Sequence, residues 1–387
     1  MHIKHFTVIL KVSERCNIDC DYCYYFNIGD ESWRDNPAYM DLATMDIICE
    51  RFAVFVQSAQ VDRLTFVFHG GEPMMAKIEN LEKFIGLARS KLGTHTDLNF
   101  AMQTNGTIIK KEWLEFFERT GLAVGISIDG PPEYNDIHRR TKQDTPTHEL
   151  VTQFVKQCAT LADEGRMKRL GTITVINNKF DVKKIVAHLQ DDFNFASMSF
   201  IMPDDAANDI LFDSRKAEQY GQALIDIYNE NVQDRRIRNK EVLKFMSRLQ
   251  PGEKEPAPVE GVVEYIGVTV QSNAVMKINE ELIATGRWRK EFPVLNLATD
   301  DILPYVETAP FSEYIRTYNR IPDKCMDCTW KHVCRGGSMQ ERKNPANGFN
   351  ERSVFCKSYQ QLYEYMYADL VGNGYPEPLL REKLSLN

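Results

Sequence analysis

The sequence lacks any long apolar segment. Its 387 residues contain no run of about 18 apolar residues, and the N-terminus has no basic segment followed by an apolar one. A membrane-spanning helix needs the first pattern and a secretory signal needs the second. We therefore expect a cytoplasmic protein with no membrane partner.

An excess of positive charge is also absent. The chain has 47 lysine and arginine residues against 55 aspartate and glutamate residues, which gives a formal net charge of −8. Nucleic-acid-binding domains usually carry a basic surface, so we expect no nucleic-acid partner. The 43% of apolar residues is ordinary for a globular protein, and the length allows two domains.

The cysteines do not form an even set for disulfides. Nine are present, and seven of them fall into two spaced groups. Clustered thiols in a chain without a signal peptide favour metal binding over disulfides. The other two, Cys49 and Cys158, fall on apolar faces of predicted helices and are expected to be buried.

The first cysteine group lacks a fourth ligand. Cys16, Cys20 and Cys23 have the spacing C-x3-C-x2-C. Three thiolates cannot close a tetrahedral zinc site or fill a cubane of four irons, so one metal would be left open to bind a small molecule. The alternative is half of a zinc site that is completed elsewhere.

Strand-like and helix-like segments alternate over the first two thirds of the chain. Apolar segments predict strands over 6–12, 64–68, 98–103, 124–128, 169–176 and 198–201. Helical periodicity follows at 45–57, 81–92, 111–119, 148–164 and 182–190. Strict alternation predicts a parallel sheet with right-handed crossovers, either open or part of a barrel.

Polar motifs follow four of these strands in turn. The cysteine loop follows the first strand, Gly70-Gly71-Glu72-Pro73 the second, Asn105 the third and Asp129 the fourth. Each motif alone could be an ordinary turn. The carboxyl ends of parallel strands share one edge, so together the motifs predict a site there.

These motifs together resemble those of the radical S-adenosylmethionine (SAM) superfamily, with Tyr22 directly before the last cysteine of the triplet. The resemblance implies a partial (β/α)6 TIM-like barrel in which the three cysteines hold a 4Fe-4S cluster. SAM would chelate the fourth iron and be cleaved reductively to a 5'-deoxyadenosyl radical, which abstracts hydrogen from the substrate.

The resemblance also implies a set of SAM contacts. The Gly-Gly-Glu-Pro motif would receive the amino group of SAM, and an arginine its carboxylate, with Arg139 and Arg140 as equal candidates. Residues 174–176 are a candidate wall of the same site. The implied contacts are Tyr22, Tyr24, Gly70, Gly71, Glu72, Pro73, Asn105, Ser127, Asp129 and one of Arg139 and Arg140.

The last third of the chain has a different texture. Helical patterns at 217–229 and 241–249 end in a segment rich in proline and charge, 251–258. A hairpin is predicted over 262–270 and 274–278, and a helix over 311–319. We therefore predict a core over 1–235, a linker over 236–258 and a C-terminal domain over 259–387.

The second cysteine group has four members, Cys325, Cys328, Cys334 and Cys356. Spacing alone slightly favours a closed zinc site over a fully ligated 4Fe-4S cluster. The segment also resembles the α+β SPASM or twitch domain that follows radical SAM cores. Ser338 and Ile278 stand where that pattern has further cysteines, so the resemblance implies one auxiliary 4Fe-4S cluster.

SPASM-type enzymes mostly modify peptides, so the resemblance implies a maturase that acts on a ribosomal precursor peptide. With the segment 27–40, which includes Trp33 and Pro37, the closest likeness is to three-residue cyclophane-forming maturases, which join an aromatic carbon to a β-carbon. A low-potential electron donor such as flavodoxin or ferredoxin would be a partner. The residues do not identify a catalytic base.

Three alternatives stay open. The first is an anaerobic sulfatase-maturating type of enzyme that makes formylglycine, although that family normally has the full cysteine set. The second is a thioether-forming maturase. The third, from another class, is a binding protein without catalytic activity whose fold is held together by structural zinc.

Overall fold

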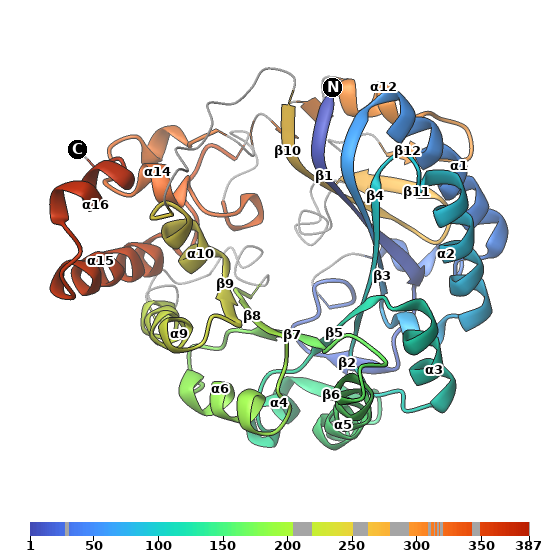
Figure 1. Cartoon of the computed structure of the whole chain (residues 1–387), viewed down its shortest axis with the longest axis horizontal. Coiled ribbons are helices and arrows are strands. Elements are labelled where there is room, and N and C mark those ends of the chain that lie inside the picture. The colour runs from blue at the N-terminus through green and yellow to red at the C-terminus, as the bar shows by residue number, and fades with distance from the viewer. Residues whose placement is uncertain are drawn as a thin grey trace.

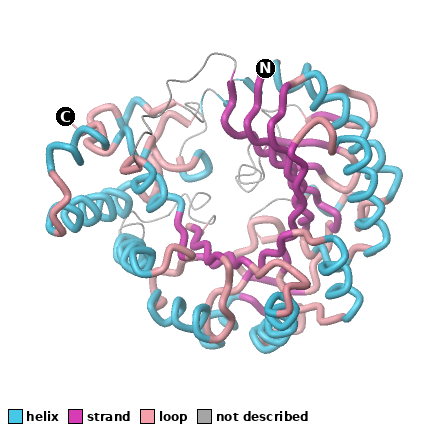
Figure 2. The backbone as a smooth tube through the Cα atoms, in the orientation of Figure 1, coloured by secondary structure: helices cyan, strands magenta, loops and turns pink. Residues whose placement is uncertain are grey.

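The computed structural model describes residues 1–27, 31–203, 219–250, 262–278, 294–308, 311–312, 314–315, 317, 320–342 and 349–386. Strands line the inside of an open arc and helices cover its outside (Figures 1 and 2). The strands form one ten-stranded sheet with the order β12-β11-β10-β1-β3-β4-β5-β7-β8-β9. The bounds are β1 (His2–Ser13), β3 (Gln60–Gly70), β4 (Asp97–Thr104), β5 (Ala123–Ser127), β7 (Gly171–Val175), β8 (Ser197–Ile201), β9 (Ile237–Asn239), β10 (Val262–Val270), β11 (Val275–Ile278) and β12 (Leu295–Asn296).

The six predicted strands are β1, β3, β4, β5, β7 and β8, which lie side by side and pair in parallel. The predicted helices between them are present, and the prediction of a partial parallel barrel is confirmed. The helices of this part are α1 (Leu42–Ser58), α2 (Ile78–Leu92), α3 (Lys111–Thr120), α4 (Pro132–His138), α5 (His148–Asp163), α6 (Val182–Asp191), α9 (Tyr220–Gln233) and α10 (Lys240–Ser247).

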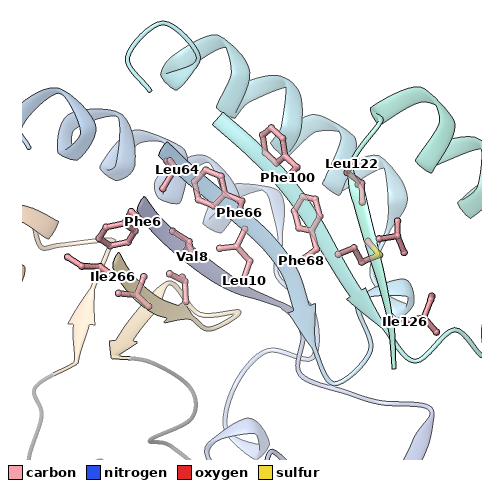
Figure 3. Close-up of a cluster of buried hydrophobic side chains, with 14 of the residues drawn as sticks. Phe6, Val8, Leu10, Leu64, Phe66, Phe68, Phe100, Leu122, Ile126 and Ile266 are labelled. Carbon is pink, nitrogen blue, oxygen red and sulfur yellow. The ribbon is translucent and has the colours of Figure 1, made fainter. Parts of the chain in front are cut away.

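The apolar core lies between the sheet and the surrounding helices. Alternate residues of a strand point to the same face, so Phe6, Val8 and Leu10 of β1 share the outer face with Phe66 and Phe68 of β3 (Figure 3). All five are fully buried. The opposite face, toward the lumen, carries polar side chains such as His69 of β3 and Gln103 of β4, which line a cavity. Cys49 and Cys158 are fully buried in the core, as predicted.

The C-terminal third adds strands to the same sheet. β10 of the predicted hairpin pairs in parallel with β1, and β11 continues the sheet in the antiparallel sense. The hairpin that we assigned to the C-terminal domain is thus joined to the core through β1. The boundaries 1–235, 236–258 and 259–387 stay predictions, and the proline-rich segment 251–258 lies outside the described residues.

The rest of the C-terminal third is helical. Its elements are α12 (Ile302–Glu307), α14 (Lys331–Cys334), α15 (Cys356–Gly372) and α16 (Glu377–Lys383). The sequence patterns did not predict α15, which packs along α9, with the Tyr228 hydroxyl donating to Asp369 at 2.7 Å. The helix predicted over 311–319 lies partly outside the described residues. Among the described helices, none has the length and apolarity to cross a membrane.

Candidate active site

The cysteine triplet lies in the loop that follows β1. Cys20 ends β2 (Ile18–Cys20), a three-residue strand that pairs antiparallel with β6 (Arg139–Thr141). The Cys23 N–H donates to the Cys20 carbonyl at 2.9 Å, which turns the chain back toward the barrel. Burial raises the pKa of the Cys16 and Cys20 thiols to about 12, so a metal must displace their protons on binding.

The β2–β6 ladder places Arg139 beside this loop. Cys20 and Arg139 are directly paired, and the Arg139 guanidinium lies 3.9 Å from the Cys20 sulfur. Arg140 points elsewhere, to the Asp144 side chain at 2.5 Å and to the Asp136 carbonyl at 2.8 Å. Of the two candidates that the sequence left equal, the structure therefore brings Arg139 to the cysteines.

Buried groups fix the direction of Arg139. Its Nε donates to Asp129 Oδ2 at 3.0 Å, and the Tyr22 hydroxyl donates to the same oxygen. Asp129 is also held by the Val175 N–H at 3.0 Å. Arg139 and Asp129 are 7% and 1% exposed, so the ion pair is shielded from water and holds the fork in one orientation.

The Glu72 carboxylate is held by hydrogen bonds within the protein. Its carboxylate accepts from the Thr104 hydroxyl at 2.7 Å and from the backbone N–H groups of Met74 and Asn105 at 2.9 and 2.8 Å. Burial raises its pKa to about 7. Glu72 thus organises the loop after β4 from inside the protein. That loop directs Asn105 Nδ2 toward the Cys16 sulfur, at 3.7 Å.

Gly70 and Gly71 let two backbones approach. The Gly71 N–H donates to the Ser13 carbonyl and the Glu72 N–H to the Arg15 carbonyl, both at 2.8 Å. A Cβ on Gly70 would lie 1.9 Å from the Ser13 oxygen, and Gly70 has φ +140. The glycines are therefore required by contact with the cysteine loop itself.

A cavity of about 200 Å³ lies among these groups. Its wall contains all three cysteines of the triplet and seven of the predicted SAM contacts, which are Tyr22, Tyr24, Gly70, Gly71, Asn105, Ser127 and Arg139. Glu72, Pro73, Asp129 and Arg140 are not part of the described wall. Of residues 174–176, Val175 is on the wall, whereas the buried Thr174 donates to the Ile128 carbonyl.

Sequence reasoning missed several polar groups of the lumen. Lys11, which pairs with His69 across β1 and β3, is fully buried, and its ammonium lies 4.0 Å from the Tyr25 ring centroid and 3.3 Å from the Tyr24 hydroxyl. Burial lowers the pKa of Lys11 to about 7, although Glu14 opposes that shift. His69 and Gln103 line the cavity. Lys11, His69 and Gln103 alternate with apolar residues along β1, β3 and β4, and this alternation was the available sign that they face the lumen.

The aromatic residues after the triplet pack on the segment that the sequence associated with peptide-modifying enzymes. The rings of Tyr25 and Phe26 lie 5.0 Å apart, and those of Phe26 and Trp33 lie 5.1 Å apart. Tyr25 donates to the buried Glu14, which also accepts from the Ser272 N–H at 3.1 Å. This packing fixes the loop against the turn between β10 and β11.

The four cysteines of the second group surround another cavity, of about 160 Å³. Cys325 ends a 3-10 turn (Asp323–Cys325), Cys334 ends α14 and Cys356 begins α15. The Cys328 sulfur accepts from Gln360 Nε2 at 3.8 Å. Trp330, Tyr359 and Tyr363 complete an aromatic wall, and burial raises the pKa of the Cys334 thiol.

The two positions that lack a cysteine are filled by other interactions. Ser338 is buried, accepts from Lys240 Nζ at 2.8 Å and caps the turn that contains Glu341. Ile278 is buried in the core opposite Val268 of β10. Because these residues are serine and isoleucine, neither position offers a thiol to a further cluster.

The chemistry of both donor sets fits iron-sulfur clusters. Cysteine thiolates are the usual ligands of a 4Fe-4S cluster, and each cysteine group lines a cavity. In the described part of the chain, no three Cys, His, Asp or Glu side chains form a ready-made site for a single metal ion.

Comparisons with known proteins identify the family. A model of the radical SAM superfamily matches residues 10–189. A cysteine-type anaerobic sulfatase-maturating enzyme of Clostridium perfringens is 23% identical over 94% of this chain and 96% of its own length. An uncharacterized protein of Synechocystis sp. is 30% identical over 94% of this chain and 91% of its length. The chain belongs to the radical SAM superfamily.

The fold of this radical SAM enzyme is also that of a solved relative. The structure of native anSMEcpe with bound AdoMet and the Kp18Cys peptide has a TM-score of 0.75, at 20% identity, over 95% of this chain and 99% of the other. Family membership confirms the predicted enzyme class and the predicted cofactors, SAM and 4Fe-4S clusters. Which residues hold them stays a prediction.

Proposed function

We propose that this protein is a radical SAM maturase that oxidises a side chain of a peptide or protein substrate and forms a crosslink. The observation that carries the proposal is the convergence of the cysteine triplet, Asn105, Ser127 and Arg139 on one cavity at the carboxyl ends of the parallel strands. The full-length similarity to a sulfatase-maturating enzyme supports a polypeptide substrate.

The residues around the cavity have separate tasks. Cys16, Cys20 and Cys23 hold the 4Fe-4S cluster, which together with SAM supplies reductive cleavage of SAM and hydrogen abstraction from the substrate. Arg139 receives the SAM carboxylate, because its guanidinium is held in the wall by Asp129. The backbone carbonyls of the Gly70-Gly71 pair suit the amino group, since no side chain blocks an approach to them.

Cys325, Cys328, Cys334 and Cys356 hold one auxiliary cluster. Four protein ligands would saturate it, so it would not bind substrate directly. When a carbon radical adds to an aromatic ring, one electron and one proton remain to be removed. A cluster held by these four cysteines would supply an acceptor for that electron, and a low-potential flavodoxin or ferredoxin would be the reductant for the cluster at the cysteine triplet.

Two observations favour an aromatic crosslink, of the cyclophane kind, on a ribosomal precursor peptide. The rings of Tyr25 and Phe26 pack on Trp33, which belongs to the segment 27–40 that resembles cyclophane-forming maturases. Ser338 and Ile278 also remove the ligands of a second auxiliary cluster. Formylglycine formation is the second candidate, because the similarity to the Clostridium enzyme spans nearly the whole chain.

The first experiment tests the cluster and SAM chemistry. Replacement of Cys16, Cys20 and Cys23 by alanine should abolish 5'-deoxyadenosine formation from SAM and dithionite, and should reduce iron from about eight to about four per chain, since each 4Fe-4S cluster holds four irons. Cys49→Ala is the matched control and should retain both. Continued 5'-deoxyadenosine formation by the triple variant would refute the assignment.

The second experiment separates the two candidate products. Peptides with an aromatic residue are incubated with the reconstituted enzyme, SAM and dithionite, and peptides with leucine at that position serve as controls. A crosslink gives loss of two hydrogens, a gap in the fragment series and no reaction with hydroxylamine. Formylglycine from serine has the same mass loss but reacts with hydroxylamine, and that result would replace the crosslink proposal.

A further inference from the structure

The N-terminal part of α15 forms one wall of the cavity of the second cysteine group. Cys356 is the first residue of this 17-residue helix. Gln360 lies one turn later on the same face, because residues four apart in a helix are neighbours. Tyr359, Gln360 and Tyr363 line the cavity together with the four cysteines. The helix therefore brings a cysteine and hydrogen-bonding side chains to the same wall.

The Tyr359 hydroxyl is a buried polar group without a partner. The residue is 1% exposed, and this hydroxyl makes no hydrogen bond in the described part of the chain. Burial, and then the nearby Glu341, raise the pKa of Tyr359 well above its ordinary value, so the hydroxyl keeps its proton. Glu341 itself accepts from the Ser353 hydroxyl at 2.8 Å. Because buried donors are nearly always paired in native proteins, an acceptor bound in the cavity would satisfy the Tyr359 hydroxyl.

The Gln360 amide lies against one of the cysteines. Its Nε2 atom donates to the Cys328 sulfur at 3.8 Å. A thiolate only accepts hydrogen bonds, so it favours the amide orientation that places the NH2 group, and not the oxygen, toward the sulfur. The rings of Tyr363 and Trp330 lie 5.7 Å apart, and this packing holds α15 against the cysteine loop. Gln360 is therefore held where its amide can donate to a group bound by Cys328.

Charges of both signs also act on the cysteines. Burial raises the pKa of the thiols of Cys325, Cys334 and Cys356. Arg352 opposes that rise at Cys325 and Cys356, whereas Glu241 adds to it at Cys334. The two donors of α15 are neutral, so their replacement removes hydrogen bonds and leaves these charges unchanged.

We infer that Tyr359 and Gln360 donate hydrogen bonds to the sulfurs of the auxiliary cluster and thereby raise its reduction potential. The inference rests on the proposed auxiliary cluster at Cys325, Cys328, Cys334 and Cys356. A 4Fe-4S cluster with four thiolates carries a net negative charge that grows by one on reduction, and hydrogen bonds to its sulfurs help to set its potential. Donors stabilise the reduced form more, because a hydrogen bond strengthens as the charge of its acceptor grows. The two side chains thus make the cluster a better acceptor for the electron that substrate oxidation releases.

The test uses the full chain with Cys16, Cys20 and Cys23 replaced by alanine, so that only the auxiliary cluster remains. Its midpoint potential is measured by electron paramagnetic resonance during a redox titration, and iron is determined in every variant. Tyr359→Phe and Gln360→Met each remove one donor and keep a side chain of similar size. Each should shift the midpoint to more negative potential. The ratio of reduced to oxidised cluster at a fixed potential should fall about threefold, a modest part of what a hydrogen bond to a charged group contributes.

Two residues of the same helix provide matched controls. The Tyr365 hydroxyl donates to Asn229 at 3.1 Å, and Gln361 is exposed. Neither residue belongs to the described wall of the cavity. Tyr365→Phe and Gln361→Met should therefore keep the midpoint of the parent chain.

The possible outcomes are distinct. Parent-like midpoints in both Tyr359→Phe and Gln360→Met, with about four irons per chain, would overturn the inference while the auxiliary cluster stands. A parent chain that binds zinc or no iron would overturn the auxiliary cluster and the inference together. A shift in one variant alone would overturn the role of the other residue. Loss of iron in both variants would show that the two side chains hold the cluster in place and do not set its potential, which would overturn the inference.

Discussion

At the residue scale, the glycine pair after β3 shows how one motif serves two purposes. The sequence predicts that the glycines allow close approach to a ligand. In the structure they also allow the cysteine loop to pack directly on the backbone of β3, through the contacts of Ser13 and Arg15. The same absence of side chains therefore supports both the cavity and the loop that forms its wall.

Gly70→Ala should destabilise the protein by at least about 2 kcal/mol, because Gly70 has a positive φ and the new Cβ would overlap the Ser13 carbonyl. Urea unfolding of the iron-free protein measures this loss without a contribution from the cofactors. Gly86→Ala on α2 is the matched control, since nothing lies near its Cβ and alanine favours a helix by about 0.5–1 kcal/mol. Equal stability of Gly70→Ala and the parent would contradict the packing argument.

Arg139→Lys should weaken SAM binding about tenfold or more, because a bidentate guanidinium contact is worth about 1.5–3 kcal/mol and lysine cannot reproduce it. Arg140→Lys should leave binding nearly unchanged, since Arg140 is held by Asp144 and Asp136. Equilibrium dialysis with labelled SAM checks both variants, after iron analysis shows that the clusters are intact. Equal losses in the two variants would remove the assignment to Arg139.

The sequence predicts which residues belong to the site, but it does not predict where their side chains point. The cysteines, Asn105 and Ser127 lie on the cavity wall, as the motifs suggested. Glu72 does not lie on this wall, because its carboxylate oxygens accept hydrogen bonds from the Thr104 hydroxyl and the Asn105 N–H of the next strand and loop. Lys11 escaped notice because an isolated lysine in an apolar strand gives no sign of its partners in Tyr24 and Tyr25.

At the element scale, long periodic segments were predictable and short paired strands were not. The six core strands and their helices follow from apolar alternation and helical periodicity. β2 and β6 have three residues each, and only their pairing makes them strands. That pairing nevertheless decides which arginine meets the cysteines. The tyrosines of α15 at 359, 363 and 367 repeat every four residues, which was an available helix signal.

The N-terminus of α1, the first helix of the barrel, shows how a local sequence signal stabilises an element. Asp41 caps α1 by accepting from the Thr44 N–H at 2.8 Å, and this hydrogen bond lowers the pKa of Asp41. Asp41→Ala should therefore cost about 1 kcal/mol at pH 7. A lowered pKa means that the ionised Asp41 carboxylate stabilises the fold at pH values above the unfolded pKa of about 3.9. This stabilisation is lost as the pH falls below that value and through the lower pKa of the folded state.

The measurement is urea unfolding of the parent and Asp41→Ala proteins between pH 7 and pH 3. The difference between their stabilities should shrink as the pH falls. Asp41→Asn keeps a good N-cap but cannot ionise, so its stability relative to Asp41→Ala should not vary with pH. A constant difference in unfolding free energy between the parent and Asp41→Ala across this pH range would show that the charge of Asp41 is not the source of the stabilisation.

At the scale of the whole molecule, the two predicted domains share structure that the sequence could not reveal. β10 and β1 pair in parallel although about 260 residues separate them, and nothing in either strand's pattern identifies its partner. α15 likewise covers α9 through contacts such as Tyr365 with Asn229. The core therefore lacks an independent edge at β1.

A fragment of residues 1–250 should consequently fail to form a stable monomer. Loss of β10 leaves one side of the long inner strand β1 unpaired, and loss of α15 uncovers the part of α9 that packs on it, which includes the buried Tyr228. Unpaired strand edges and exposed apolar faces promote aggregation. Sedimentation and urea unfolding, with the full chain expressed in parallel, check the expectation. A soluble monomeric fragment that unfolds cooperatively would instead establish the core as an autonomous domain, with the β10–β11 hairpin a dispensable extension of its sheet.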